Sequence, residues 1–477
     1  MSFDSKVAVG LGWMAGANFL SQVVTWAITI VVMRILSPSD YGLLAMASVF
    51  VALLSMMATA GLGPAIVQAS EIDDAKLRQL LGLIIVLNIV LFLLLFFAAQ
   101  PIATFFDEPR LTDIIRVLSA QFVVAGFAVI PESLLGRALK FKMRALVDLS
   151  SHVAGAVVTL VLALSGYGVW SLIAGTIVSV TGKSIGLNIA APYLRWPDFS
   201  LRGTGPLIAF GSNVTAARVL WFFYSQADMF IAGKLLGKEA LGFYSVAMHL
   251  ASLPVQKISG VLNQVAFPAF SQIQHDLHVV AAQFLKAARL LSFFAFPVLW
   301  GISSIAPELV RLVLGAKWDL AIFPLQVLPA IMPLRMISNF LPSAVDAVGR
   351  PDISVKNLIS ACLIMPTAFF VGSKWGVEGL CMAWLIGFPL VFLGNLRRAL
   401  PAIGLTVGDV VRAMAWPALA SMMMYGSVVF VSRVLLMQTH DAEKLALMVL
   451  IGAIVYGGLA ITTNRDGCKL VIGALRR

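Results

Sequence analysis

Two long apolar segments, joined by a short polar turn near Gly237, occupy residues 205–267. Each is longer than the roughly 20 residues that an α-helix needs to cross the hydrocarbon core of a bilayer. Of the 477 residues in the chain, 60% are hydrophobic and 12% are charged, whereas about a quarter of the residues in a soluble domain are charged. The sequence therefore predicts an all-α polytopic membrane protein.

The apolar segments along the chain predict about fourteen transmembrane helices. The longest polar stretches, near 192–204 and 270–286, leave no room for a soluble domain, which needs at least about 50 residues. The first helix is expected to be retained, because the N-terminal sequence shows no clear signal-peptide cleavage site. The expected helices lie near residues 8–33, 42–65, 79–99, 113–135, 148–165, 168–191, 205–235, 240–266, 287–304, 320–345, 354–373, 376–396, 410–432 and 445–463.

Lysine and arginine are distributed unevenly between the two sets of loops. With both termini cytoplasmic, twenty of these residues fall in cytoplasmic segments and ten in outer segments, and four more lie inside helices. Loops rich in lysine and arginine stay preferentially on the cytoplasmic side. We therefore expect both termini to be cytoplasmic. The formal net charge of +11 follows from this bias and does not indicate a nucleic-acid partner.

An internal duplication divides the chain. Residues 33–53 align without gaps on residues 233–253, an offset of 200, and residues 165–175 resemble residues 373–383. Six helices in each half is an even number, so both halves enter the membrane from the same side and form a parallel repeat. We predict an N-terminal six-helix lobe (1–203), a second six-helix lobe (204–400), and a C-terminal part (401–477) with two extra helices and a cytoplasmic tail.

Polar residues follow one face of several expected helices. The first helix carries Asn18, Gln22, Thr25 and Thr29 at spacings of four, three and four residues, which place them on one face. A comparable stripe, which includes His249, follows the helix near 240–266. Such residues can hydrogen-bond neighbouring helices, but stripes in both halves favour a shared polar cavity between the lobes, where repeat transporters bind their ligands.

Four basic residues, Lys183, Arg218, Lys257 and Arg335, fall inside expected helices. At about 1.5 Å of rise per residue, all four lie in the cytoplasmic half of the membrane. Lys183 is expected to extend its ammonium group to the inner interface. Arg218, which has the poorest route to water, is expected to face a cavity, and Lys257 and Arg335 fit either interpretation. A cationic site of this kind would bind an anionic head group.

A buried carboxylate and an imidazole form a second candidate site. Asp228, in the apolar segment that ends at the Gly237 turn, could take up a proton together with His249 across that turn. A structural, hydrogen-bonded aspartate is the alternative. His275 and His278 have no third metal ligand, and the three cysteines form no CxxC pair. We therefore expect no metal, no cofactor and no catalytic residue.

Three sequence stretches resemble the signatures of a known family: RILSPSDYGLLAM, QADMFIAGKLLGKEALGFYSVAM and GYGVWSLIAG. They are similar to the polysaccharide transporter family of Wzx-type flippases, in the multidrug, oligosaccharidyl-lipid and polysaccharide exporter superfamily, and most of all to its colanic acid and xanthan branch. The resemblance implies two lobes around a central cavity and alternating access. It implies further that the two extra helices border a groove for a lipid tail, and it places Asp228 at an acidic position of the family motif.

These observations predict a non-enzymatic flippase of the bacterial inner membrane. The substrate that the resemblance implies is an oligosaccharide linked to polyprenyl pyrophosphate, used for exopolysaccharide or lipopolysaccharide synthesis, and glycan polymerase machinery is a possible partner. The predicted substrate-binding residues are Arg218, Lys257, Arg335, Asn18 and Gln22. The alternatives are a multidrug or cation antiporter, whose site should be richer in acidic groups, and a membrane glycan polymerase, which would need a long catalytic loop.

Overall fold

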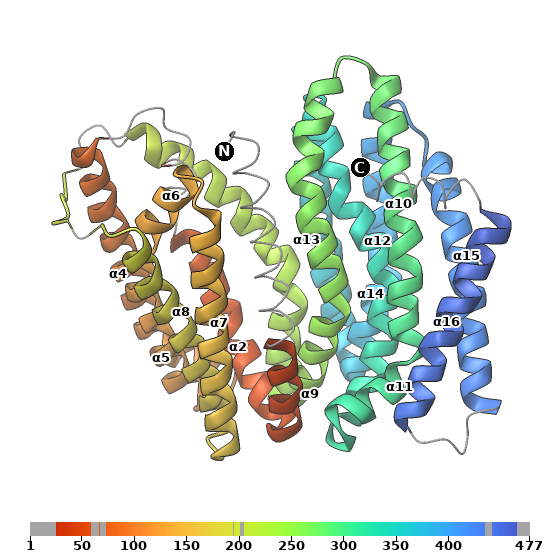
Figure 1. The fold of residues 1–477 in the computed structure, drawn as a ribbon, viewed down its shortest axis with the longest axis horizontal. Helices are drawn as coiled ribbons and strands as arrows, with labels where there is room; N and C mark the ends of the chain where they lie inside the picture. The colour runs from red at the N-terminus through yellow and green to blue at the C-terminus, as the bar shows by residue number, and fades with distance from the viewer. Residues whose placement is uncertain are drawn as a thin grey trace. The chain divides into compact units, whose positions relative to one another are not determined.

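The computed structural model describes residues 25–58, 66, 73–193, 195–200, 205–434 and 441–464, and for 205–218, 257 and 260–265 it describes the backbone alone. The chain divides into two compact units, Met1–Gly242 and Phe243–Arg477. Every regular element in the described ranges is helical (Figure 1). The predicted all-α polytopic fold is confirmed, whereas the lobe boundaries derived from the duplication stay a prediction.

The first unit contains two closely packed helix pairs. Here α4 packs along α5, and α7 packs along α8 (Figure 1). Its elements are the helix Thr25–Ile35, α2 (Pro38–Ala58), α4 (Asp74–Phe105), α5 (Leu111–Gly126), α6 (Val129–Arg137), α7 (Phe141–Leu164), α8 (Val169–Ala190) and the first part of α9 (Gly205–Ile273), which is broken at Gly237.

The second unit contains the remainder of α9 and the C-terminal helices. Its elements are α10 (Leu277–Ser304), α11 (Ala306–Leu309), η1 (Val310–Leu314), η2 (Ala316–Ala321), α12 (Ile322–Ala347), α13 (Pro351–Gly372), η3 (Ser373–Trp375), α14 (Gly376–Ala399), η4 (Leu400–Ile403), α15 (Val407–Val434) and α16 (Asp441–Thr463).

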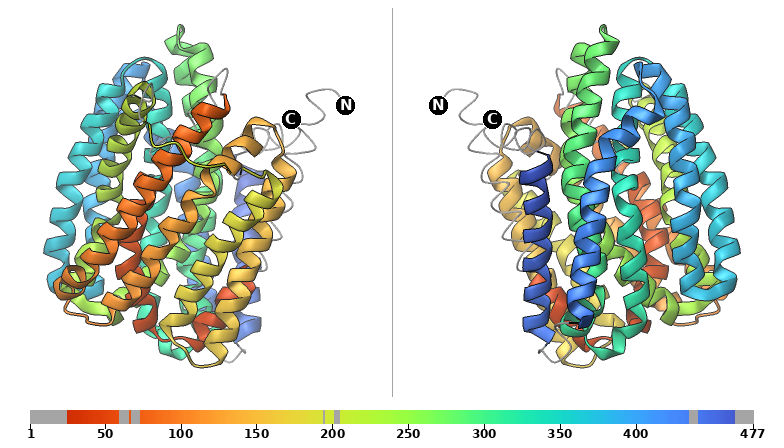
Figure 2. Two further views of the ribbon diagram at one scale, coloured as in Figure 1. Left: turned by 90° about the vertical axis from the view of Figure 1, so that its left-hand side faces the viewer. Right: turned by 90° about the vertical axis from the view of Figure 1, so that its right-hand side faces the viewer.

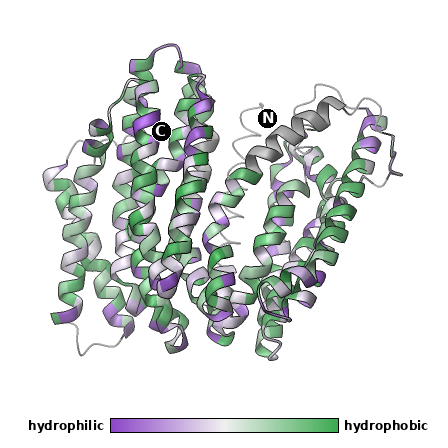
Figure 3. Ribbon diagram, turned by 180° about the vertical axis from the view of Figure 1, so that it is seen from behind, coloured by the Kyte–Doolittle hydropathy of each residue, from purple (hydrophilic) through white to green (hydrophobic). Residues whose placement is uncertain are grey.

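The described helices have the length and composition of membrane spans. Nine are long and apolar enough to cross a bilayer, or ten if a bent pair counts as one. This count treats α13 and α14 as one span and does not include α9, so the expected total of fourteen stays a prediction. The spans are hydrophobic along much of their length (Figure 3). They expose large apolar side chains, as a lipid environment allows, among them Phe97, Leu164, Ile189, Leu363, Ile386 and Phe430.

The single helix expected near 113–135 is instead a bent pair. Helix α5 ends at Gly126, α6 begins at Val129, and their axes differ by 42°. Two carbonyl groups beside the bend accept hydrogen bonds from α8. The Ser184 hydroxyl donates to the Val124 carbonyl (2.9 Å), and the Asn188 side-chain amide donates to the Phe127 carbonyl (2.9 Å). These bonds to a neighbouring helix stabilise a break that the apolar pattern does not reveal.

The two copies of the duplicated hairpin have the same local structure. In the first copy, a helix ends at Ile35 and α2 begins at Pro38. In the second, the break falls at Gly237, the residue that the offset of 200 pairs with Ser37. Gly168 and Gly376, which precede α8 and the main part of α14, also agree: both have positive φ (55° and 68°) and strongly negative ψ, a combination that only glycine adopts readily.

The two hairpin copies touch through equivalent residues. A Cβ atom at Gly42 would overlap the Lys238 carbonyl oxygen, and a Cβ at Gly242 would overlap the Pro38 carbonyl oxygen. The offset of 200 pairs Gly42 with Gly242 and Pro38 with Lys238, so the contact is related to itself by a local two-fold axis, like an isologous interface. Glycine at both positions lets the two backbones approach closely.

Two ion pairs lie next to this contact. The Lys234 ammonium is 2.6 Å from Asp107, and the Lys238 ammonium is 2.7 Å from Glu108. Both carboxylates lie in the short turn between α4 and α5. The pairs therefore tie α9 to the end of α4 beside the glycine contact.

The two C-terminal helices pack on α10 through polar bonds as well as apolar contacts (Figure 2). The Tyr456 hydroxyl on α16 donates to the Phe293 carbonyl oxygen (2.7 Å), and the Phe293 ring stacks on Trp416 of α15. The Lys444 ammonium lies 2.8 Å from the buried Glu308 carboxylate. These bonds attach α15 and α16 to the second unit.

Candidate functional site

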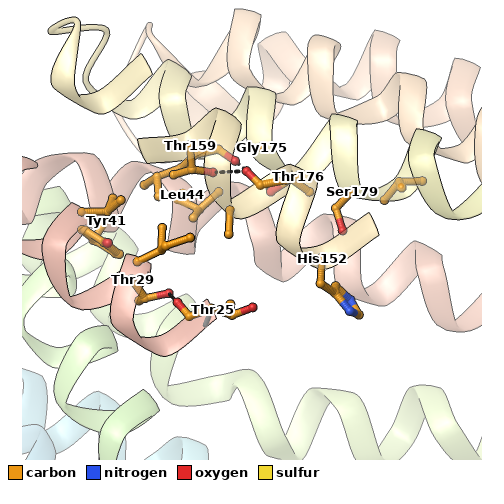
Figure 4. A pocket seen from close by; sticks show the side chains of 15 residues that line it. Thr25, Thr29, Tyr41, Leu44, His152, Thr159, Gly175, Thr176 and Ser179 are labelled. Atoms are coloured by element: carbon orange, nitrogen blue, oxygen red, sulfur yellow. Dashed lines mark hydrogen bonds between the residues drawn. The ribbon is translucent and has the colours of Figure 1, made fainter. Parts of the chain in front are cut away.

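A pocket of about 320 Å³ lies in the first unit, between the helix Thr25–Ile35, α2, α7 and α8 (Figure 4), with a mostly apolar surface that also carries hydroxyl groups and one imidazole. Thr25 and Thr29 form one wall, and side chains of α7 and α8 face them. The lining residues are Thr25, Ile28, Thr29, Val32, Tyr41, Leu44, His152, Gly155, Ala156, Thr159, Leu172, Gly175, Thr176, Ser179 and Val180. Among these described residues there is no acidic or permanently charged side chain.

Small residues shape the floor of the pocket. A Cβ at Gly155 would lie 2.6 Å from the Gly175 carbonyl oxygen, and a Cβ at Gly175 would overlap the Thr159 hydroxyl. Helices α7 and α8 therefore approach each other closely at this level. The absence of side chains at both glycines leaves the Thr159 and Thr176 hydroxyls at the pocket surface.

The threonine hydroxyls of the pocket are oriented by their own helices. Thr29 donates to the Thr25 carbonyl (2.7 Å), Thr159 to the Gly155 carbonyl (2.9 Å) and Thr176 to the Leu172 carbonyl (2.9 Å). Each bond uses the single hydroxyl proton, so the oxygen lone pairs remain as acceptors. The Thr25 hydroxyl is buried and has no hydrogen-bond partner within the described ranges. The exposed imidazole of His152 adds a donor and an acceptor to the same pocket.

The polar stripe predicted on the first helix is only partly described. Asn18 and Gln22 lie outside the described residues, and Thr25 and Thr29 line the pocket. This pocket lies within one unit. The cavity shared between lobes, and the binding roles of Asn18 and Gln22, stay predictions.

The predicted cationic residues lie in different surroundings. Arg218 and Lys257 lie in α9, and for these two residues only the backbone is described. Arg335 lies near the middle of α12 and is half-buried, with its guanidinium carbon 4.7 Å from the centre of the Trp384 ring. Lys183 is paired with two carboxylates, and its reach to the inner interface stays a prediction. Its ammonium lies 3.3 Å from Glu132 and 3.2 Å from Asp148, because two neighbouring helices supply carboxylates that compensate its charge.

The two residues of the predicted proton site belong to different units. Asp228 is buried (2% exposed), and its carboxylate accepts a hydrogen bond from the Met229 backbone N–H at 2.8 Å. His249 is exposed and lies in the part of α9 that belongs to the second unit. Proton coupling between them stays a prediction. No cluster of three potential metal ligands exists in the part of the chain that the structure describes.

Sequence reasoning missed the side chains that α7 and α8 contribute to the pocket. His152, Gly155, Ala156 and Thr159 follow one face of α7, and Gly175, Thr176 and Ser179 follow one face of α8. Both sets have the helical spacing that identified the stripe on the first helix. The signal was therefore present in the sequence, as small and polar residues on one face of two apolar helices.

The fold and the pocket define a polytopic membrane protein with a neutral, hydroxyl-lined pocket among its membrane-spanning helices. The polysaccharide biosynthesis protein family model matches residues 31–322, more than half of the chain. The chain therefore belongs to this family, as the resemblance of its motifs predicted.

Individual relatives agree with this assignment. The lipopolysaccharide biosynthesis protein WzxC of Escherichia coli (strain K12) is 28% identical over 392 residues, which cover 81% of this chain and 79% of WzxC. The succinoglycan biosynthesis transport protein ExoT of Rhizobium meliloti (strain 1021) is 28% identical over 342 residues, which cover 70% and 68% of the two chains. Lipid II flippase MurJ in its inward closed conformation matches with a TM-score of 0.72 at 16% identity, covering 95% of this chain and 99% of MurJ, and shares its fold.

Proposed function

We propose that this protein is a flippase that moves a lipid-linked oligosaccharide across the bacterial cytoplasmic membrane, from the inner to the outer leaflet, by alternating access. It performs no covalent chemistry. A charged sugar–phosphate head group cannot cross hydrocarbon unaided, because its polar groups would lose their hydration. A polar path through the protein replaces that hydration while the lipid tail stays in the bilayer.

The observation that carries this proposal is the set of uncharged hydroxyl groups in the lining of the pocket. Its oriented threonine oxygens and the His152 imidazole offer hydrogen-bond partners for sugar hydroxyls. A cation antiporter, the alternative, would instead place carboxylates at its site. No lining residue that the structure describes is an aspartate or a glutamate.

Several finer features belong to the same proposal. The carrier lipid is a polyprenyl pyrophosphate, both termini are cytoplasmic, and the exported units supply a glycan polymerase. Arg218, Lys257 and Arg335 bind the anionic part of the substrate, and Asn18 and Gln22 extend the polar path along the first helix. Membership of the polysaccharide biosynthesis family supports a lipid-linked glycan substrate. The lysine and arginine bias supports the cytoplasmic termini, and the residue roles rest on the positions of these residues inside helices.

A deletion strain tests the proposal. Without the protein, the lipid-linked glycan should accumulate on the cytoplasmic leaflet, and a plasmid copy should restore export. Leaflet location is measured by the access of an added, membrane-impermeant glycosidase to the glycan in right-side-out and inverted vesicles. Unchanged glycan distribution together with increased sensitivity to cationic drugs would favour the antiporter.

A matched pair of threonines tests the pocket. Thr176→Val removes a pocket hydroxyl, and Thr367→Val removes an exposed hydroxyl on α13 that makes the same bond to the carbonyl four residues earlier. We expect Thr176→Val to reduce export per molecule by about three- to tenfold, the value of one to two hydrogen bonds, and Thr367→Val to leave it unchanged. Equal effects of the two substitutions would remove the pocket from the transport path.

A further inference from the structure

Arg335 carries its charge far from either end of its helix. It lies near the middle of the 26-residue helix α12, about 18 Å of helical rise from each end at 1.5 Å per residue. An arginine side chain is too short to bring its guanidinium to an interface over that distance. A charge at this depth is costly unless a partner or a polar cavity compensates it.

The surroundings of Arg335 differ from those of the lysines in the same protein. Lys183 and Lys444 each have a carboxylate within 3.3 Å. The Arg335 guanidinium instead lies over the face of the Trp384 ring, at 4.7 Å. Within the described ranges it has no ion pair and no hydrogen bond. A cation–π contact uses no N–H group as a hydrogen-bond donor, so the guanidinium N–H groups stay able to donate.

The Trp384 ring is itself held in place. Its indole N–H donates to the Tyr244 hydroxyl at 2.8 Å, and the two side chains are 1% and 0% exposed. The rings of Phe369 and Phe388 pack on it, with centroids 5.2 Å and 5.8 Å away. Tyr244 thus fixes the orientation of the Trp384 ring, against which the Arg335 guanidinium lies.

We propose that Arg335 is an anion-binding residue for the diphosphate of the substrate, and that Trp384 and Tyr244 are its positioning residues. This inference rests on the proposed function. A planar guanidinium can hold two phosphate oxygens at once, which an ammonium group cannot do. A guanidinium group that is already held against a ring needs little reorganisation to bind an anion. Within the described ranges no carboxylate pairs with it, so its charge is available to the substrate. The bound diphosphate then compensates the charge of Arg335 within the membrane.

Binding of inorganic pyrophosphate to the purified full-length protein in phosphatidylcholine nanodiscs tests the assignment by calorimetry. Arg335→Ala removes the charge and should weaken binding by about tenfold or more. Arg335→Lys keeps a charge but removes the planar guanidinium group, and should weaken binding by about three- to tenfold. Trp384→Phe keeps a smaller ring without the N–H and should weaken binding about threefold. The control Trp416→Phe also loses an indole hydrogen bond, to Thr463, and should bind as the unmodified protein does.

Several results would overturn the assignment. They are pyrophosphate binding that does not change in Arg335→Ala, absence of binding by the unmodified protein, or a lower melting temperature of Arg335→Ala with unaltered affinity. If Trp384→Phe does not fold, Tyr244→Phe takes its place. This substitution preserves the packing and should cause a small loss of affinity. Competition by phosphatidylglycerol as strong as that by a polyprenyl diphosphate would identify a general phospholipid site instead.

The same variants in the deletion strain separate this inference from the proposed function. If the unmodified protein restores glycan export and Arg335→Ala restores it equally, the Arg335 site is wrong and the flippase proposal stands. If the unmodified protein does not restore export, the proposed function fails, whatever pyrophosphate binding shows.

Discussion

At the scale of single residues, several buried polar side chains in the spanning helices are bonded to backbone carbonyl groups of their own or a neighbouring helix. Buried Asn88 donates to the Ile84 carbonyl (2.9 Å) and to the Ala58 carbonyl (3.2 Å). Trp300 donates to the Ala330 carbonyl (3.0 Å) in the proline-rich helix α12. Because lipid offers no hydrogen bonds, such pairing lowers the cost of placing a polar atom away from water. Asp228 follows this rule through its bond from the Met229 N–H.

The bonding of Asp228 predicts a structural role. Asp228→Asn keeps a side-chain oxygen as acceptor, so we expect near-normal abundance and an unchanged dependence of export on the proton gradient. Asp228→Ala removes the acceptor in a buried site, which should lower stability by about 1–3 kcal/mol and reduce membrane abundance. Export per molecule, measured with and without a protonophore, checks both. Loss of gradient dependence in Asp228→Asn would identify a proton carrier instead.

At the scale of elements, the two copies of the duplicated hairpin contact each other. Its two copies meet at the equivalent glycines Gly42 and Gly242, each against the backbone of the other copy. The two copies are therefore similar in sequence and also in direct contact. The ion pairs of Lys234 with Asp107 and of Lys238 with Glu108 lie next to this contact.

The glycine contact predicts a coupled response to substitution. Gly42→Ala and Gly242→Ala should each destabilise the purified protein by about 1–3 kcal/mol, the usual cost of overpacking. The double variant should cost less than the two single costs together, because the first substitution already separates the helices. The control Gly426→Ala, in α15 with open space around its Cβ position, should be neutral or slightly stabilising. Thermal unfolding in detergent measures all four, and additive losses would contradict a shared contact.

At the scale of the whole molecule, the twenty-to-ten bias in lysine and arginine predicts which loops face the cytoplasm. The structure supplies exposed positions in the loops on which this prediction can be tested. Lys140, Glu239 and Lys374 are exposed, whereas Ser373 is only 7% exposed and would react poorly.

Cysteine labelling checks the orientation. In a variant without native cysteines, Glu239→Cys and Lys374→Cys should react with an impermeant thiol reagent added to intact cells. Lys140→Cys, between α6 and α7, should react only after permeabilisation. The reverse pattern would place the termini outside. Equal reactivity of all three before permeabilisation would show leaky cells, and the measurement would be repeated in sealed vesicles of known orientation.

The sequence by itself determined the membrane environment, the helical class and the positions of several helix breaks. Long apolar segments and a low charge content leave few alternatives in a bilayer. The breaks at Gly237, Gly168 and Gly376 follow from local residue properties that repeat between the halves. The polar face of the first helix was also predictable, because helical spacing is a property of a single segment.

Only the tertiary structure decided which polar groups meet. Lys183 finds carboxylates on α6 and α7, His152 joins Thr25 in one pocket, and Trp384 connects Arg335 with Tyr244. The α5–α6 bend likewise depends on bonds from α8. The physical reason is that helix faces toward lipid and faces toward protein are both apolar, so the pattern within one segment does not specify its neighbours. Partners far apart in the chain are selected by how the helices pack.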